Sequence, residues 1–317
     1  MAVRKGRRSL DPSNLSTCQA RQLLMTRHSS LFGKRNSASA ANGSATRALN
    51  GVHRIGFCSL ILGVLLFSSC GGGLSAPSHT APSSDPAGHA TGTTMTNLQA
   101  KAGWKGFGEL APAYVPCSSC SPQVTWKMTQ TSTAAQFDIG GTVPYSDVLW
   151  SNAVIGQGST QGVPDSNETL VPTLKNFTYD AWFMSHNLPV SQVLEFDVSQ
   201  YLNGKSFIWG HQCRIAGGHQ WDIWDNTNNQ WVGTGVACNP INGEWNHVVI
   251  QMQRTSDNRL LYQSITLNDV TSVLNQTYSP GSVPSGWYGI TLHFQMDGDY
   301  KQTPYTVFLD KLNFTYW

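Results

Sequence analysis

Apolar and polar positions alternate with a period of two along the centre of the chain. Between residues 193 and 254 the sequence runs VLEFDVSQYL, KSFIWGHQCRI, HQWDIWD, QWVGTGVAC and EWNHVVIQMQR, with Gly, Asn or Asp clusters between the runs. Each run has the length of a strand and is rich in the aromatic and β-branched residues that favour strands. Consecutive strands with short turns predict an antiparallel meander, and Cys213 and Cys238 inside it predict a disulfide.

The alternation continues on both sides of this region. Further strand-like runs begin at residue 143, and a last run, YTVFLDKLNFTYW, ends the chain. No helical period appears and turn residues recur throughout, a pattern typical of all-β proteins. The sequence therefore predicts an all-β domain over residues 137–317, built as an antiparallel two-sheet jelly-roll sandwich.

The part of the chain before this domain divides into four segments. Residues 1–54 are basic and rich in Ser and Asn, which predicts a disordered leader. Residues 55–69 are a continuous apolar run, shorter than the ~20 residues of a membrane span and suited to a signal-peptide core. Residues 70–97 predict a flexible Gly/Ser/Thr/Pro linker, and residues 98–136 a transitional segment that packs on the domain.

Charge is distributed unevenly between the leader and the rest. Ten of the twenty Lys and Arg residues lie in residues 1–54 together with one of the eighteen acids, so the remainder of the chain is acidic. The formal net charge of +2 therefore gives no indication of a basic surface on the domain. We expect no nucleic-acid partner.

The end of the apolar run, Phe67-Ser-Ser-Cys70-Gly71, resembles the bacterial lipoprotein signal, in which small residues precede a Cys that becomes lipidated. The resemblance implies a mature protein that begins at Cys70 and is lipid-anchored in the cell envelope, with Gly71 favouring the outer membrane. Phe67 stands where the family prefers Leu, Val or Ile, and an ordinary signal peptide of a secreted protein is the alternative.

In an oxidising compartment, Cys117 and Cys120 predict a local disulfide rather than a metal site.

A second resemblance lies in the C-terminal half. The run GEWNHVVI at residues 243–250, the following SITLNDV and the closing YTVFLDKLNF resemble the concanavalin A-like lectin/glucanase superfamily, which includes laminin-G-type modules. The likeness covers residues 147–317 and implies the sandwich fold. It implies little about chemistry, because lectins, glycosidases and lyases share that fold.

Glu195-Phe-Asp197-Val-Ser-Gln200 resembles the E-x-D-x-x-E signature of laminarinase- and lichenase-type endo-β-glucanases. On a strand, Glu195 and Asp197 would face solvent, and in the family a bulge brings the second Glu onto the same face. Here Gln200 holds that position, and an amide cannot act as a general acid or base. The motif therefore favours binding without cleavage, with hydrolysis through Glu195 and Asp197 as the alternative.

The segment FQMDGDYKQ resembles the Y-F-K-x-G-x-Y-x-Q strand of alginate lyases, matching it at Gly298, Tyr300 and Gln302. The resemblance implies that Tyr300 would transfer a proton if the protein were a lyase. Met296 replaces the expected Lys, and no Arg stands near Glu195. A turn between strands with a half-buried Tyr is the alternative.

Strand parity groups the remaining candidates for sugar binding. If the strands around residues 180 and 293 adjoin the Glu195 strand in one sheet, its exposed face combines Trp, His, amides and acids, a composition that binds sugars. We therefore expect a non-catalytic, lectin-like module with a glycan partner and membrane contact only through the lipid anchor; a purely structural surface role is the other possibility. The expected binding residues are Asp180, Trp182, Glu195, Asp197, His293 and Gln295.

No cofactor is expected. His211, His219 and His247 lack the close spacing of a metal triad, and no Gly-rich phosphate loop opens a helix. A structural calcium ion that braces the sandwich is the one exception left open.

Overall fold

The computed structural model describes residues 92–109 and 123–317. The predicted leader, signal-peptide core, lipidated Cys70 and Cys117–Cys120 disulfide lie outside these residues, as does most of the predicted linker. The described residues form seventeen strands and two short 3-10 helices, η4 (Leu98–Ala100) and η5 (Leu188–Val190). Their alternating apolar pattern gives the all-β fold that the sequence predicts.

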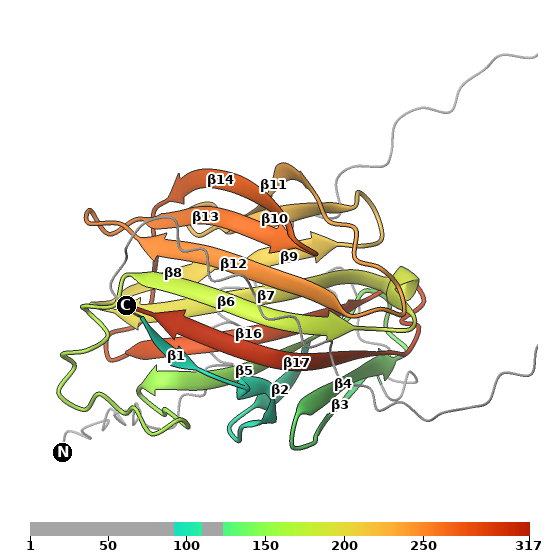
Figure 1. Ribbon diagram of the computed structural model, residues 1–317, viewed down its shortest axis with the longest axis horizontal. Helices are drawn as coiled ribbons and strands as arrows, with labels where there is room; N and C mark the ends of the chain where they lie inside the picture. Colours follow the sequence, from blue (N-terminus) through green and yellow to red (C-terminus); the bar gives the residue numbers. More distant parts are fainter. Residues whose placement is uncertain (1–91, 110–122) are drawn as a thin grey trace, which may run out of the picture.

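The strands form two antiparallel sheets that stack as a sandwich (Figure 1). Sheet A has eight strands in the order β14-β13-β12-β6-β17-β4-β3, with β1 paired to β17. Its strands are β1 (Thr93–Met95), β3 (Val124–Gln130), β4 (Ala134–Gly141), β6 (Asn176–Met184), β12 (Asn246–Arg254), β13 (Leu260–Leu267), β14 (Val270–Tyr278) and β17 (Tyr305–Tyr316).

Sheet B has nine strands in the order β11-β10-β9-β7-β16-β5-β2, with β8 paired to both β7 and β15. At the centre of each sheet, strands that are distant in sequence are neighbours, as in a jelly roll: β16 lies between β7 and β5. The strands of sheet B are β2 (Lys105–Glu109), β5 (Asp147–Gly156), β7 (Ser191–Leu202), β8 (Lys205–Trp209), β9 (His211–Arg214), β10 (Gln220–Asp225), β11 (Gln230–Ala237), β15 (Gly281–Ser282) and β16 (Gly289–Gly298).

The core fills the space between the sheets and is rich in aromatic rings. Phe196 of β7 lies at its centre, with ring centroids 5.2 Å from Phe183 of sheet A and 5.6 Å from Phe294 of sheet B. Burial of such large apolar side chains is the main favourable term for the fold. The predicted parity is confirmed, because Leu194, Phe196 and Val198 all belong to this core.

The predicted meander is only partly correct. The strands from β7 to β11 belong to one sheet, whereas β12 crosses over and pairs with β6 and β13 in sheet A. The sandwich also begins before the expected boundary at residue 137, because β1, β2 and β3 are strands of the two sheets. The segment expected to pack on the domain, residues 98–136, therefore supplies part of the domain itself.

The predicted disulfide between Cys213 and Cys238 is confirmed, with a Cα–Cα distance of 5.6 Å. It joins β9 to the residue that follows β11, across the intervening β10. Both residues are fully buried in the core. The disulfide therefore fastens the outer strands of sheet B.

Candidate functional site

Polar side chains line the outer face of sheet B, the face turned away from the core. Because side chains alternate along a strand, the residues between the core positions of β7 point to this face. The same rule applies on four neighbouring strands, β5, β16, β9 and β10. We call the resulting group the polar band: Ser151, Glu195, Asp197, Ser199, Gln212, Asp222, His293 and Gln295.

Strand register brings the members of the polar band together. Glu195 lies opposite Gln295 on β16 and Gln212 on β9, and Asp197 lies opposite His293. Gln295 Nε2 donates a hydrogen bond of 2.9 Å to Glu195 Oε1. The structure groups four of the six predicted binding residues on one face, as expected: Glu195, Asp197, His293 and Gln295.

Further hydrogen bonds extend the band across the sheet. The ring of His293 contacts hydroxyl oxygens through both nitrogens, Ser151 Oγ at 2.7 Å and Ser199 Oγ at 3.1 Å. On the other side of β7, Gln212 Nε2 donates to Asp222 Oδ2 at 2.7 Å. These bonds fix the orientation of the polar groups, which is the condition for specific recognition of a ligand.

Asp197 is buried, whereas the sequence predicts that it faces solvent. It is 0% exposed, and the backbone amide of His211 donates a 3.0 Å hydrogen bond to its Oδ1. Burial, and secondarily the charge of Asp197, raises the pKa of Tyr179 and of Tyr262, two residues of sheet A that lie in the core. Glu195 is also nearly inaccessible, at 3% exposed, so the prediction that both acids face solvent is wrong.

The accessible groups lie at the rim of the band. Trp231 of β11 is partly exposed, and its ring meets the buried Trp224 at a centroid distance of 5.3 Å. Gly210 leaves room for this pair, since a Cβ atom there would lie 2.8 Å from Trp224 Cβ and 3.0 Å from Trp231 Cη2. Arg214, also partly exposed, forms a 2.8 Å ion pair with Asp222 Oδ2. An aromatic ring and a guanidinium group therefore border the band on the β9–β11 side.

Gln200 does not join this face. The β7–β16 register is regular from Tyr201 to Val193, so no bulge moves residue 200 toward Glu195. The Gln200 side chain lies on the core side, where Nε2 donates to the Val171 carbonyl at 2.9 Å and Oε1 accepts from Arg254 Nε at 3.0 Å. The endo-β-glucanase pattern is therefore divided between the two faces of β7.

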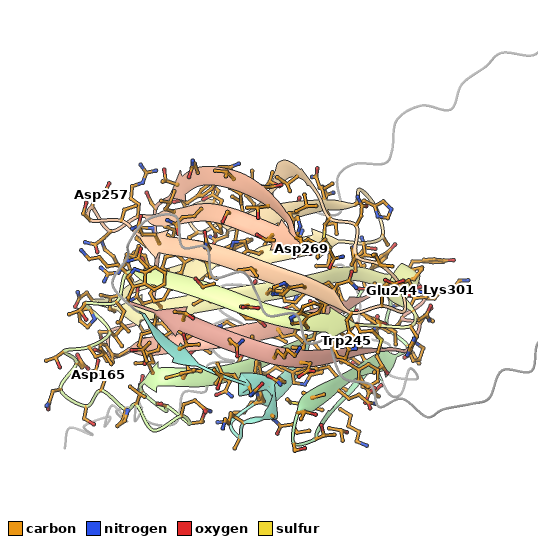
Figure 2. All side chains as sticks on the ribbon, viewed as in Figure 1. Asp165, Glu244, Trp245, Asp257, Asp269 and Lys301 are labelled. Atoms are coloured by element: carbon orange, nitrogen blue, oxygen red, sulfur yellow. A yellow bond between two sulfur atoms is a disulfide. The ribbon has the colours of Figure 1, made fainter. Side chains whose placement is uncertain are left out.

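Tyr300 also lies away from the polar band. It follows the end of β16, is 60% exposed, and has Lys301 Nζ 5.1 Å from its ring centroid. Figure 2 shows Lys301 at one end of the long axis of the sandwich. The expected half-buried Tyr is thus an exposed one at the end of the sandwich.

Asp180 and Trp182 lie on the opposite side of the molecule from the polar band. Their strand, β6, belongs to sheet A, so the expectation that they share a face with Glu195 is wrong. Asp180 Oδ1 is 2.8 Å from His247 Nε2. The Trp182 ring stacks on His247 at 4.6 Å, and Lys311 Nζ lies 5.5 Å from its centroid.

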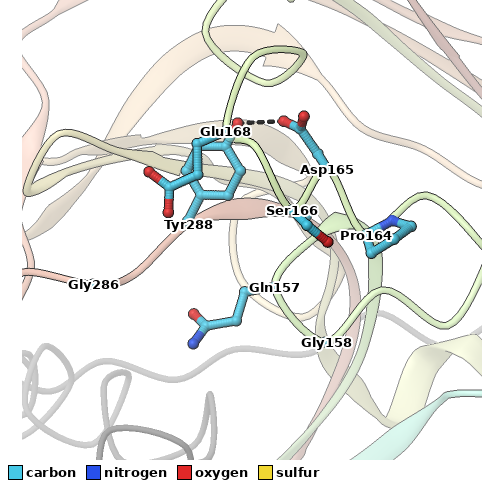
Figure 3. Close-up of a pocket in the computed structure, with 9 residues that line it drawn as sticks. Gln157, Gly158, Pro164, Asp165, Ser166, Glu168, Gly286 and Tyr288 are labelled. Atoms are coloured by element: carbon cyan, nitrogen blue, oxygen red, sulfur yellow. Dashed lines mark hydrogen bonds between the residues drawn. The ribbon is translucent and has the colours of Figure 1, made fainter.

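A cavity of about 320 Å³ opens among the loops at the other end of the sandwich from Lys301 (Figures 2 and 3). Asp165 borders it and accepts hydrogen bonds from the Tyr288 hydroxyl and from the backbone amides of residues 169–171. Burial opposes ionisation, but these hydrogen bonds lower the pKa of Asp165 to about 2. None of the residues predicted as binding sites borders this cavity.

The described residues hold neither a metal-binding cluster nor a membrane-spanning helix. No group of three or more His, Cys, Asp or Glu residues within ranges 92–109 and 123–317 is arranged to hold a metal ion. No helix in these same ranges is long and apolar enough to cross a membrane.

Comparison with known proteins gives structural matches only. No protein-family model and no curated protein matches the chain by sequence. Solved structures that match include lectin II from Ulex europaeus (13% identity, 67% of this chain and 98% of that chain, TM-score 0.37). A carbohydrate esterase from the Shiga toxin-encoding bacteriophage phi24B matches at 10% identity over 71% of this chain and 98% of that chain, with a TM-score of 0.36.

An alginate lyase mutant in complex with alginate trisaccharide matches at 10% identity over 60% of this chain and 86% of that chain, with a TM-score of 0.36. At these TM-scores the matches carry no argument about the site. The strand order and register of the chain itself define the fold.

Proposed function

We propose that this chain is a carbohydrate-binding, lectin-like protein that recognises a polysaccharide on the outer face of sheet B and does not cleave it. The observation that carries this proposal is the polar band, a hydrogen-bonded array of acids, amides, hydroxyls and an imidazole on the face opposite the core. Such groups match the alternating donors and acceptors of sugar hydroxyls.

The rim of the band supplies the groups that would touch the sugar. Trp231 offers part of a flat ring for stacking on a pyranose, and Arg214 and Asp297 are the partly exposed polar groups beside the band. Asp297 is fixed by Gln295 Nε2, which donates to its Oδ1 at 3.0 Å. The buried members of the band orient these rim groups, so little conformational entropy is lost on binding.

Three features favour binding over cleavage. Gln200 is bound to Arg254 in the core, Tyr300 is on an exposed turn, and Asp197 is buried against a backbone amide. General acid–base catalysis needs two titrating groups that both reach the scissile bond. Weak sugar binding, on the order of −4 to −8 kcal/mol, needs only stacking and hydrogen bonds.

The test combines a glycan array with assays for new reducing ends and for unsaturated products, using the purified full-length protein. We expect retention on at least one polysaccharide and no product from it. Steady product formation that disappears in Glu195→Gln would show an enzyme instead. Retention by no glycan would favour the structural surface role.

We also propose that Cys70 carries a lipid that anchors the protein in the outer membrane. The support is the sequence around Phe67 to Gly71 alone. Cys70→Ser should abolish incorporation of labelled fatty acid. Persistent labelling in that variant would contradict the anchor, and the protein would then be a secreted one or be attached elsewhere.

A further inference from the structure

A second aromatic ring lies at the side of the sandwich, apart from the polar band. Trp126 belongs to β3, the edge strand of sheet A, and is 45% exposed. Its indole lies against β2, the edge strand of sheet B, and β2 and β3 are neighbours in space (Figure 1). The ring therefore covers the side of the sandwich where the two sheets meet.

Two glycines of β2 form the surface under this ring. A Cβ atom on Gly106 would lie 2.8 Å from Trp126 Cδ1, and one on Gly108 would lie 2.5 Å from Trp126 Cζ3. Any other residue at these positions would push the indole away. The ring is thus seated flat along the Gly106-Phe-Gly108 backbone, with its pyrrole side over one glycine and its benzene side over the other.

Both supporting strands are held in their sheets. Trp126 is paired with Ile139 of β4, and Gly106 is paired with the fully buried Trp150 of β5. Side chains alternate along β3, so Thr125 and Lys127 point to the other face of the sheet, and the neighbours on the Trp126 face are Val124 and Met128, which pack against the core. Because these two are partly buried, Trp126 supplies most of the exposed apolar surface here, which is much smaller than a protein–protein interface requires.

We infer that Trp126 is a second carbohydrate-binding platform, which stacks on the apolar face of a pyranose ring in a neutral polysaccharide. A rigid indole with one face covered and the other exposed loses little entropy when a sugar covers it. The neighbours on the same face of β3, Val124 and Met128, carry no charge, which suits a neutral sugar. The inference does not depend on the polar band, which lies on a different face.

Affinity electrophoresis of the full-length protein in gels that contain laminarin, xylan or galactomannan tests this inference. Trp126→Ala should weaken retardation by about five- to tenfold, whereas Trp126→Tyr, which keeps a flat ring, should stay within about twofold of the wild type. Gly108→Ala, whose Cβ would meet the Trp126 ring first and so displace it without removing it, should weaken retardation as well. Unchanged retardation of Trp126→Ala, or no retardation of the wild type by any polymer, would overturn the inference.

A spectroscopic measurement covers the case in which a variant is unstable. In protein labelled with 5-fluorotryptophan, the 19F resonance that is lost in Trp126→Phe identifies this ring. That resonance should shift when the retarding polysaccharide is added, and a resonance that does not move would overturn the inference. A shift of Trp126 without a shift of Trp231 would support this platform and contradict the polar-band proposal, and the reverse result would do the opposite.

Discussion

The two outer faces of the sandwich use similar residues in different ways. On sheet A, Asp180, His247 and Trp182 form a local cluster: the carboxylate pairs with the imidazole across neighbouring strands, and their side chains remain 35% and 17% exposed. On sheet B, acids, amides and His293 are almost completely buried and are bonded in sequence across the strands.

This difference matters because the free energy of a polar contact depends on its exposure. A partly exposed polar pair competes with water and contributes little to stability, whereas a buried polar network is expensive to leave incomplete. The core between the sheets does not require a polar network on an outer face. We therefore interpret the network of sheet B as serving recognition and the cluster of sheet A as surface structure.

The largest expected effect concerns the outer strands of sheet B. Replacing both Cys213 and Cys238 by Ser should lower the free energy of unfolding by about 3 kcal/mol, because the disulfide closes a loop of 25 residues in the unfolded chain. Denaturant titration checks this, with the reduced wild type as the control. If the double variant unfolds at the same denaturant concentration as the oxidised protein, the disulfide does not fasten these strands.

The next effect is a dependence on pH that arises beneath sheet B. Burial, only partly offset by backbone hydrogen bonds, lowers the pKa of His211 from 6.5 to about 3. As the pH falls, His211 takes up a proton in the unfolded chain before it does so in the folded protein. Its contribution to the free energy of unfolding is therefore present above pH 6.5 and is lost as the pH falls toward 3. Uptake of this one proton by the unfolded chain should lower the free energy of unfolding by about 2 kcal/mol between pH 6.5 and pH 5.

Urea titrations at these two pH values measure that loss, and His211→Gln, which cannot titrate, is the matched control. The variant should lose less stability than the wild type over the same interval. Equal losses in the two proteins would show that His211 is not the group responsible.

A smaller pair of effects compares the two faces directly. Gln295→Ala removes the amide that donates to Glu195 and should cost about 1 to 3 kcal/mol of stability. His247→Ala removes the hydrogen bond between the imidazole and Asp180 on sheet A and should cost less than about 1 kcal/mol. Thermal unfolding of both variants measures the two costs. If the two costs are equal, or the sheet A variant is the less stable one, the contrast between the faces is not real.

Strand parity explains how far the sequence alone could predict this structure. Alternation along β7 placed Leu194, Phe196 and Val198 in the core and Glu195 and Asp197 on the other face. The same alternation in QWDIWD could have identified Asp222 and Trp224, since Trp221 and Ile223 are core residues. Neither residue belongs to a motif that resembles a known family, so motif resemblance alone does not point to them.

The sequence alone does not predict which distant strands pair with each other. Whether β6 joins β7 or β12 depends on long-range packing, so Trp182 could not be assigned to a sheet from its neighbours in the chain. The burial of Asp197 depends on the break between β8 and β9. At this break the backbone amide of His211 is available to donate a hydrogen bond to the Asp197 carboxylate. Parity predicts which face a side chain occupies, but not how well that face is covered.

The affinity of two matched variants for the retained polysaccharide tests the central claim most directly. Trp231→Ala and Trp182→Ala each remove one partly exposed Trp, the first from the rim of the polar band and the second from sheet A. Isothermal titration should give an affinity about tenfold weaker for Trp231→Ala, or about 1.4 kcal/mol, and within about twofold of the wild type for Trp182→Ala. Equal affinities for the two variants, or a larger loss for Trp182→Ala, would contradict recognition on the outer face of sheet B.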